Sequence, residues 1–203
     1  MPSRFDIVKN GVILTENQRG NSSVPKSFEQ KLFYNHVLPR PGSILKIDLG
    51  SNLVGSLCHL GIYAGSNLIV ESIQADGSGM IRTVSPKAFF EYSLWPDGVF
   101  IYAACGKTDG KYYPLADQEI AKRALKAAGN PDFFLLPDDG HQFAEYCITG
   151  EYDSLTGTLE NVEARLAEHF QLSGPGRVPG SIPASPVCWV STGVSMNDFF
   201  PDD

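Results

Sequence analysis

Residues 57–71 read LCHLGIYAGSNLIVE, and this stretch carries the most specific pattern in the chain. Two short apolar runs flank a Gly-Ser-Asn break, which is typical of a β-hairpin. Because side chains alternate along strands, His59 and Glu71 each project from one face of their strand. A three-residue loop over 64–66 would place His59 opposite Glu71, whereas a two-residue turn of Gly65 and Ser66 would place it opposite Ser72. The register therefore determines whether an imidazole and a carboxylate meet.

Further strands and a short helix are expected around the hairpin. Ser85 followed by Pro86 is the pattern of a cap and a first helical residue, which predicts a short helix to about residue 92. Ahead of the hairpin, residues 23–39 are expected to form a helix that ends near a Pro-Gly turn. The expected strands cover residues 44–47, 80–84 and 99–104.

The second half of the chain is predicted to be helical. Asp117 can cap a helix that ends at Gly129, which suits the left-handed C-terminal position. Asp139, with Gln142 three positions later, forms a capping-box pattern that predicts a helix over 140–150. The first of these helices and a third one have apolar stripes. The stripes consist of Ile120, Ala121, Ala124, Leu125 and Ala128, and of Leu159, Val162, Leu166 and Phe170.

Composition and charge exclude several classes of protein. The chain has 203 residues, 42% of them hydrophobic, and a formal net charge of −7. An acidic balance argues against a nucleic-acid partner, and no apolar run approaches the roughly 18 residues of a membrane helix. The start has no signal-peptide pattern, and the four cysteines form no CxxC pair. A cytoplasmic location with free thiols is therefore expected.

The chain is predicted to form one domain with a C-terminal extension. The domain covers residues 1–172, and the Gly-, Pro- and Ser-rich extension covers 173–203. Because the extension contains large apolar residues such as Trp189 and Phe199, part of it is expected to pack on the domain as irregular structure.

Two stretches together resemble the lecithin:retinol acyltransferase (LRAT) branch of the permuted papain-like, NlpC-type thiol hydrolases. The first comprises PGSIL (41–45), HLGIYAG (59–65) and IVE (69–71), and the second comprises AKRA (121–124) and FLLPDDGHQF (134–143). The resemblance spans about residues 40–150. It implies an α+β, circularly permuted papain-like fold with a small antiparallel sheet packed against helices. One position departs from the family pattern, because Gly140 stands where the family has its nucleophilic cysteine.

The resemblance also implies roles for three residues. His59 matches the base, Glu71 the group that orients it, and Gly140 the position of the nucleophile. A thiol at a helix N-terminus is more easily ionised, and a neighbouring imidazole can take its proton and return it to a leaving group. Backbone N–H groups of the first helical turn can hold a developing oxyanion.

Other residues could take part in the site. His141 could line the same cleft, and a metal site with His59 and Glu71 is conceivable, although the spacing forms no ligand signature. Cys147 lies two turns along the helix from Gly140 and is expected to be a buried structural thiol. Cys58 must point away from the face of His59, which makes it a poor partner for that imidazole. No cofactor is implied.

Two functions follow, and they differ in whether Gly140 marks a missing nucleophile or is the natural residue of a binding protein. In the first, the chain is the scaffold of a cysteine hydrolase or acyltransferase for amide, thioester or lipid-ester transfer, with its nucleophile missing. In the second, it is a natural pseudoenzyme that binds a small acyl or amide ligand, or a peptide, in the retained cleft. A structural partner protein would instead have the cleft filled by the segment around Trp189. The oligomeric state is left open.

Overall fold

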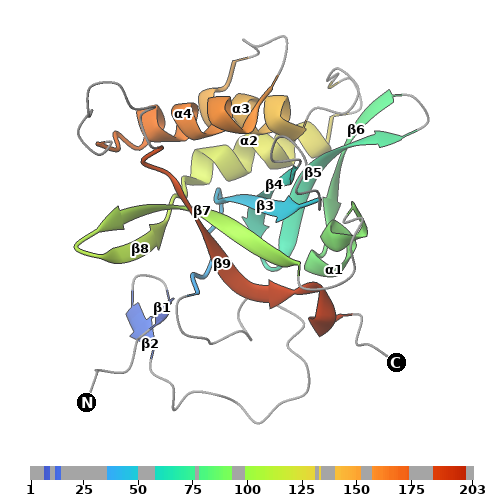
Figure 1. The fold of residues 1–203 in the computed structure, drawn as a ribbon. Coiled ribbons are helices and arrows are strands. Elements are labelled where there is room, and N and C mark those ends of the chain that lie inside the picture. The colour runs from blue at the N-terminus through green and yellow to red at the C-terminus, as the bar shows by residue number, and fades with distance from the viewer. Residues whose placement is uncertain are drawn as a thin grey trace.

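The structure is an α+β arrangement in which helices pack against an antiparallel sheet (Figure 1). It is a computed structural model. The residues it describes are 7–9, 12–14, 36–49, 58–75, 78–92, 99–130, 133, 140–151, 157–173 and 185–199.

Among the described residues, seven strands form the main sheet, and every pair of neighbours is antiparallel. Six of them follow the order β6-β5-β4-β3-β7-β8, and the last strand, β9, also pairs with β7. The strands are β3 (Ile44–Asp48), β4 (Cys58–Gly65), β5 (Leu68–Ala75), β6 (Ser78–Val84), β7 (Phe100–Thr108), β8 (Lys111–Pro114) and β9 (Cys188–Ser195). A separate two-stranded sheet consists of β1 (Ile7–Lys9) and β2 (Val12–Leu14).

The predicted hairpin is present as β4 and β5, but neither predicted register is correct. Ser66 and Asn67 form the turn with φ of 52° and 58°, the backbone conformation of a type I′ turn. The register shifts between Tyr63 and Gly65, so Glu71 pairs with Gly61. The turn lies one residue later than the predicted turn of Gly65 and Ser66, and the irregularity in β4 also shifts the pairing. Together these two changes place His59 and Glu71 on the same face of the sheet, as diagonal neighbours.

The helices match most of the sequence predictions. Ser85, Asp117 and Thr158 each accept a backbone N–H as N-caps, and Gly150 ends its helix with φ of 83°. The helices are α1 (Pro86–Phe89), α2 (Gln118–Ala128), α3 (Gly140–Thr149) and α4 (Leu159–His169), with single 3-10 turns η3 (Phe90–Tyr92) and η4 (Met196–Asp198). None of the helices among the described residues is long and apolar enough to cross a lipid bilayer.

Two details of these helices differ from the prediction. Gly129 is right-handed, with φ of −88°, because its N–H still donates to the Leu125 carbonyl and continues the helical turn. Leu125 itself is 42% exposed, so the apolar stripe of α2 is narrower than expected. The helix predicted over 23–39 falls mainly outside the described residues, and its described part, 36–39, is not helical.

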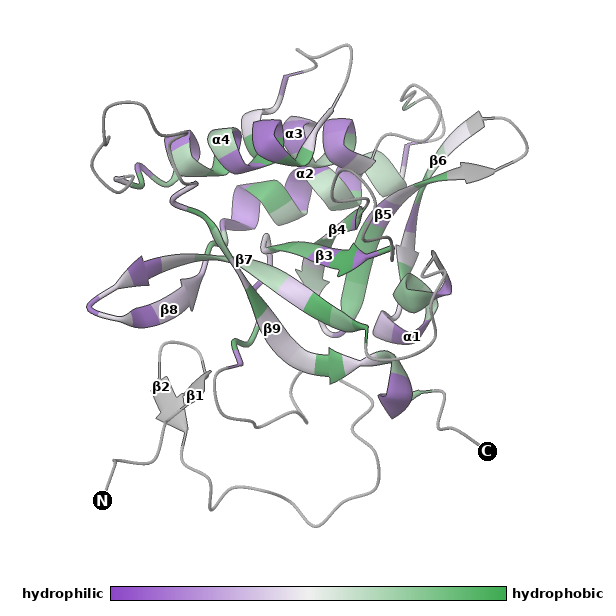
Figure 2. Cartoon of the chain, viewed as in Figure 1, coloured by the Kyte–Doolittle hydropathy of each residue, from purple (hydrophilic) through white to green (hydrophobic). Residues whose placement is uncertain are grey.

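Hydrophobic residues pack on both faces of the central strands. Leu60 and Ile62 face a core shared with α2, α3 and α4, whereas Leu45 and Ile47 face a second core around Phe89. Figure 1 shows α2, α3 and α4 lying together over one face of the sheet. In Figure 2 strands β3 and β4 are mostly hydrophobic, whereas β8 is mostly hydrophilic. Strand β4 thus separates the two cores.

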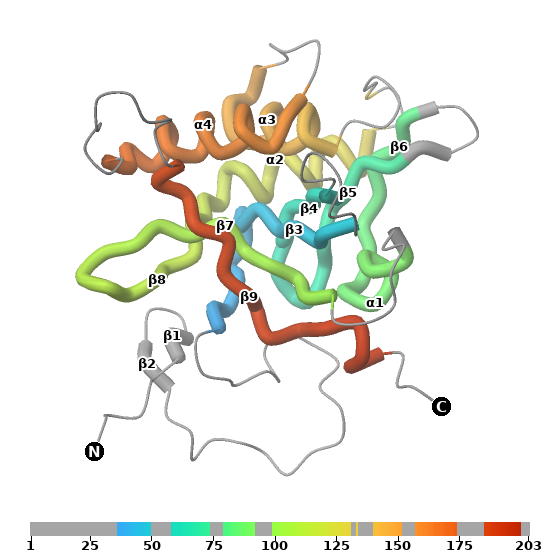
Figure 3. The backbone as a smooth tube through the Cα atoms, in the orientation of Figure 1, coloured from blue at the N-terminus to red at the C-terminus, as the bar shows by residue number. Residues whose placement is uncertain are grey.

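The C-terminal segment was expected to pack on the domain as irregular structure, but it contains a regular strand. Cys188–Ser195 forms β9 along β7, and Figure 3 shows this last strand crossing the sheet beside β7. Val194 is fully buried in the second core, and the Ser191 carbonyl accepts a hydrogen bond from the Val37 N–H at 3.0 Å. The strand lies so far along the chain from β7 that local composition could not reveal the pairing.

Candidate active site

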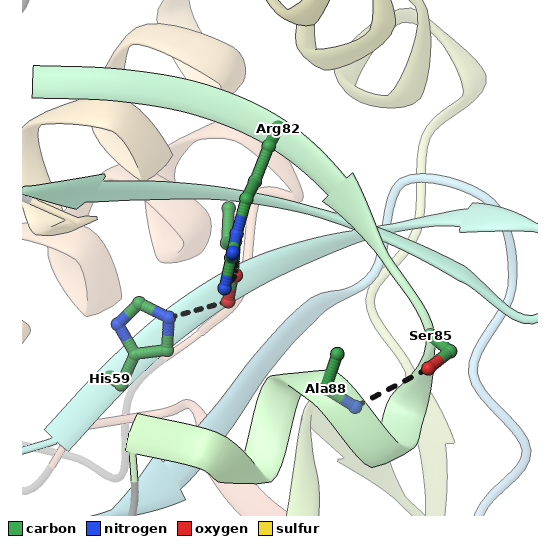
Figure 4. Close-up of polar contacts among 5 residues, drawn as sticks. His59, Arg82, Ser85 and Ala88 are labelled. Carbon is green, nitrogen blue, oxygen red and sulfur yellow. Dashed lines mark hydrogen bonds and ion pairs between the residues drawn. The ribbon is translucent and has the colours of Figure 1, made fainter. Parts of the chain in front are cut away.

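A buried hydrogen bond joins the hairpin strands at the candidate site. His59 Nε2 lies 2.8 Å from Glu71 Oε2, and the two side chains come from β4 and β5. His59 is 9% exposed and Glu71 is fully buried. Figure 4 shows the side chains of His59 and Arg82, and a dashed line marks the hydrogen bond of the imidazole. The diagonal register of the hairpin is what allows this contact.

Arg82 completes the coordination of the buried carboxylate. It lies on β6 directly across from Glu71, and its Nε and Nη2 each lie 2.8 Å from Glu71 Oε1. The guanidinium supplies charge-assisted hydrogen bonds to the carboxylate and compensates for its removal from solvent. Each oxygen of Glu71 thus has a cationic or polar hydrogen-bond donor.

This arrangement selects one tautomer of the neutral imidazole. An ionised carboxylate can only accept, so His59 Nε2 must donate its hydrogen to Glu71. The other ring nitrogen, Nδ1, then carries the lone pair and can act as a proton acceptor. The tautomer follows from the hydrogen-bond network.

Nδ1 of His59 lies close to the first residue of α3. A Cβ atom built on Gly140 would lie 3.9 Å from His59 Nδ1, and 3.8 Å and 3.7 Å from the N and O atoms of Leu60. These are ordinary van der Waals distances, so a side chain at position 140 requires no displacement of its neighbours. A thiol there would lie one bond further along, within reach of the imidazole.

Phe89 packs against the same imidazole. The two ring centroids are 5.1 Å apart, at an interplanar angle of 40°. Helix α1 presents this ring, and its first turn is held by the bond from Ala88 N–H to Ser85 Oγ (Figure 4). Gly61 permits the close approach, since a Cβ there would lie 2.9 Å from Phe89 Cε2. The aromatic contact limits the rotation of His59.

Helix α3 is also held at its far end. Arg123 on α2 donates from Nε to the Cys147 carbonyl at 2.6 Å and from Nη2 to the Ile148 carbonyl at 2.8 Å. These carbonyls belong to the last turn of α3, where intrahelical partners run out. The cation also complements the negative end of the helix dipole. The capping role predicted for Asp139 falls outside the described residues.

The structure brings together His59, Glu71 and Gly140, but it places His141 elsewhere. His141 Nε2 lies 3.5 Å from Cys58 Sγ, on the face of β4 opposite to the His59 imidazole. Within the described ranges, no group of three or more His, Cys, Asp and Glu side chains is arranged to hold a metal ion.

The remaining cysteines lie away from the candidate site. Cys147 is fully buried, and burial raises the pKa of its thiol far above the ordinary value. Cys105 lies on β7 and is also fully buried. Trp189, on β9, donates from Nε1 to Glu163 Oε1 of α4 at 2.7 Å.

Sequence reasoning missed Arg82, Phe89 and the Cys58–His141 contact. Arg82 could have been found, because opposite charges on adjacent strands often pair and residues 80–84 were expected to form a strand. The other two depend on how α1 and α3 approach the sheet, which no local pattern encodes.

No protein-family model matches the chain, and neither the curated proteins nor the solved structures contain a match to it.

Proposed function

We propose that the chain has the scaffold of an LRAT/NlpC-like thiol hydrolase or acyltransferase, built on a permuted papain-like fold, in which Gly140 occupies the nucleophile position. The observation that supports this proposal is the 3.9 Å distance from His59 Nδ1 to the Cβ position of residue 140. A proton acceptor, a buried carboxylate behind it and a helix N-terminus in front of it form the set that a thiol nucleophile requires.

Each residue would have a definite task in such a site. A thiol at position 140 would pass its proton to His59 Nδ1, and Glu71 would stabilise the resulting imidazolium through Nε2. The imidazolium would then protonate the leaving group of an amide, thioester or ester. Backbone N–H groups at the start of α3 would face the developing oxyanion.

As the sequence stands, the second candidate function is a binding module. Gly140 offers no nucleophile, and a Cβ atom built on it would meet Leu60 and His59 Nδ1 at ordinary contact distances. A small carboxylate or acyl ligand could bind at this position and accept hydrogen bonds from the first turn of α3. The glycine itself is the observation that favours this alternative.

A direct test restores the missing thiol. In the Gly140→Cys variant we expect iodoacetamide to alkylate Cys at position 140 about 100-fold faster than in Gly140→Cys/His59→Gln, because the imidazole acts as the base. Peptide mass mapping separates this thiol from the four natural cysteines. Equal rates in the two variants, with both folded by circular dichroism, would contradict the assignment of the site.

The binding alternative is tested on the unmodified chain. Octanoate, a simple carboxylate probe, should shift the NMR signals of His59 and of the α3 first-turn amides, and His59→Gln should weaken this binding. If octanoate at millimolar concentration leaves these signals unchanged, carboxylate binding at this position is excluded.

A further inference from the structure

We infer that Cys105 and Cys188 are a site of reversible oxidation, and that a thiol oxidant joins them in a disulfide that ties β9 to β7. Both thiols are free in the structure. This inference is independent of the proposed function, because no step of it involves His59, Glu71 or Gly140.

The strand register places the two cysteines directly opposite each other. Cys105 on β7 pairs with Cys188 on β9, at the end of four consecutive pairs that begin with Tyr102 and Ser191. Opposite residues of antiparallel strands have Cα atoms about 4.5–5.5 Å apart. Disulfides span Cα distances of roughly 4.4–6.8 Å, so the backbone already has the spacing that the bond requires.

The two side chains also lie on the same side of the sheet. Directly opposite residues project to one face, and both cysteines belong to the core around Phe89 and Phe90. Burial raises the pKa of the Cys105 thiol, and the neighbouring Cys188 raises it further. An electrostatic effect between them is consistent with two sulfur atoms that lie close together.

Their different exposures set the order of the reaction. Cys105 is fully buried, whereas Cys188 is partly exposed. With glutathione disulfide as the oxidant, the Cys188 thiolate attacks one sulfur and forms a mixed disulfide, releasing one glutathione thiolate. The Cys105 thiolate then attacks Cys188 Sγ and releases the second glutathione. The two protein thiols lose two electrons and two protons, and the glutathione disulfide gains both.

The high pKa of Cys105 slows the second step, because only its thiolate attacks. The mixed disulfide on Cys188 should therefore be detectable first and should convert to the intramolecular bond later. The resulting ring encloses α2, α3 and α4, which lie between the two cysteines in sequence. Such a cross-link restricts the unfolded chain and stabilises the fold.

The test exposes the folded, full-length chain to glutathione disulfide and follows it by peptide mapping. We expect a Cys105–Cys188 peptide that has lost two hydrogens, together with a rise in the thermal midpoint of about 5–10 °C that dithiothreitol reverses. Cys188→Ser should abolish both effects, whereas the matched variant Cys147→Ser should retain them.

Two results would overturn the inference. One is a stable glutathione adduct on Cys188 with Cys105 left reduced after prolonged incubation. The other is a disulfide that forms between two chains in place of the one within a single chain. Because the mapping uses the unmodified protein, it gives an answer even if a variant does not fold.

Discussion

Glu71 is the residue on which the geometry of the candidate site depends. Its fully buried carboxylate receives His59 on one oxygen and Arg82 on the other. Arg82 binds Oε1 and His59 Nε2 binds Oε2, and a Cβ atom built on Gly140 would lie 3.9 Å from the other ring nitrogen, Nδ1. The buried carboxylate thus sets which nitrogen of the ring donates.

This arrangement predicts a tautomer switch in Glu71→Gln. Arg82 can only donate, so the amide oxygen of the glutamine should turn towards it and the amide NH₂ towards His59. His59 Nε2 would then have to accept, and the proton would move to Nδ1. In ¹⁵N NMR we expect the Nε2–H form in the unmodified chain and the Nδ1–H form in the variant.

His169 provides an internal control for this measurement. Its Nε2 contacts Asp117 Oδ2 at 2.9 Å, far from the substitution in sequence, and its signals should not change. A variant in which His59 keeps its Nε2–H would show that Glu71 does not set the tautomer. In that case the base assigned to Nδ1 would lose its physical support.

Gly61 is required by the packing around the imidazole. A Cβ at this position would lie 2.6 Å from Ile69 Cγ2 and 2.9 Å from Phe89 Cε2, both closer than real Cβ contacts. We expect Gly61→Ala to lower the free energy of unfolding by about 1–3 kcal/mol, because the ring that covers His59 must move. Urea denaturation measures the change.

Gly129→Ala is the matched comparison. The nearest atoms to its Cβ would be carbonyl oxygens at 3.6 Å and 3.8 Å, and its φ of −88° suits alanine. This variant should be neutral, or more stable by about 0.4–1 kcal/mol. Equal losses in the two variants would mean that steric conflict with Phe89 is not the cause.

At the scale of elements, Asp117 links two helices. Oδ1 accepts the Glu119 N–H at 2.9 Å as the cap of α2, and Oδ2 contacts His169 Nε2 in the last turn of α4. The backbone bond from Glu119 is the main cause that lowers the pKa of Asp117, and His169 contributes to the same effect. One short side chain therefore holds the start of α2 and the end of α4 together.

A lowered pKa gives this carboxylate a stabilising effect that depends on pH. The effect is fully present above the ordinary aspartate pKa of about 3.9 and is lost as the pH falls through the lower folded value. Asn is also a good N-cap, so Asp117→Asn should leave the cap and remove the charge. The stability difference between the two proteins should be constant from pH 5 to 6 and disappear at the acid end of the titration.

Asp117→Ala completes this comparison, since it removes the cap as well and should cost about 1 kcal/mol even at acid pH. Chemical denaturation at each pH provides the values. If the stability difference between the unmodified chain and Asp117→Asn persists at the acid end, the charge of Asp117 is not responsible for it.

The elements show which parts of the fold sequence patterns can predict. Period-two alternation and turn residues revealed the β4–β5 hairpin, and caps at Ser85 and Asp117 located the starts of α1 and α2. These signals are local. The register of the hairpin depends on the position of the turn. Ser66 and Asn67 both adopt positive φ and form the turn, but Gly65 made a turn of Gly65 and Ser66 equally plausible from the sequence.

The candidate site shows the same division. Alternation put His59 and Glu71 on compatible faces, and the helix expected to begin at Gly140 does begin there. The approach of α3 to β4, and the Cys58–His141 contact that accompanies it, depends on how three helices pack on the sheet. That packing is non-local, and it is determined by the whole core and not by a motif.

At the scale of the whole molecule, the C-terminal strand is part of the domain. β9 lies along β7, buries Val194 in the core around Phe89, and accepts a hydrogen bond from Val37, which precedes β3. Thr192 is also fully buried, and its hydroxyl donates to the Ile101 carbonyl at 2.8 Å. Gly, Pro and Ser in the preceding segment conceal this strand in the composition.

Removing residues 188–203 should therefore destroy cooperative folding and not merely shorten a tail. The truncation leaves the backbone groups of β7 without their β9 partners and exposes the apolar surface that Val194 covers. We expect poor dispersion in amide NMR spectra and no sigmoidal urea transition. Trp189→Phe is the matched control, because it removes the bond to Glu163 and keeps an aromatic ring on β9, and it should cost about 0.5–1.5 kcal/mol with the transition retained. A truncated chain that unfolds with the same midpoint and slope as the full chain would place β9 outside the cooperative unit.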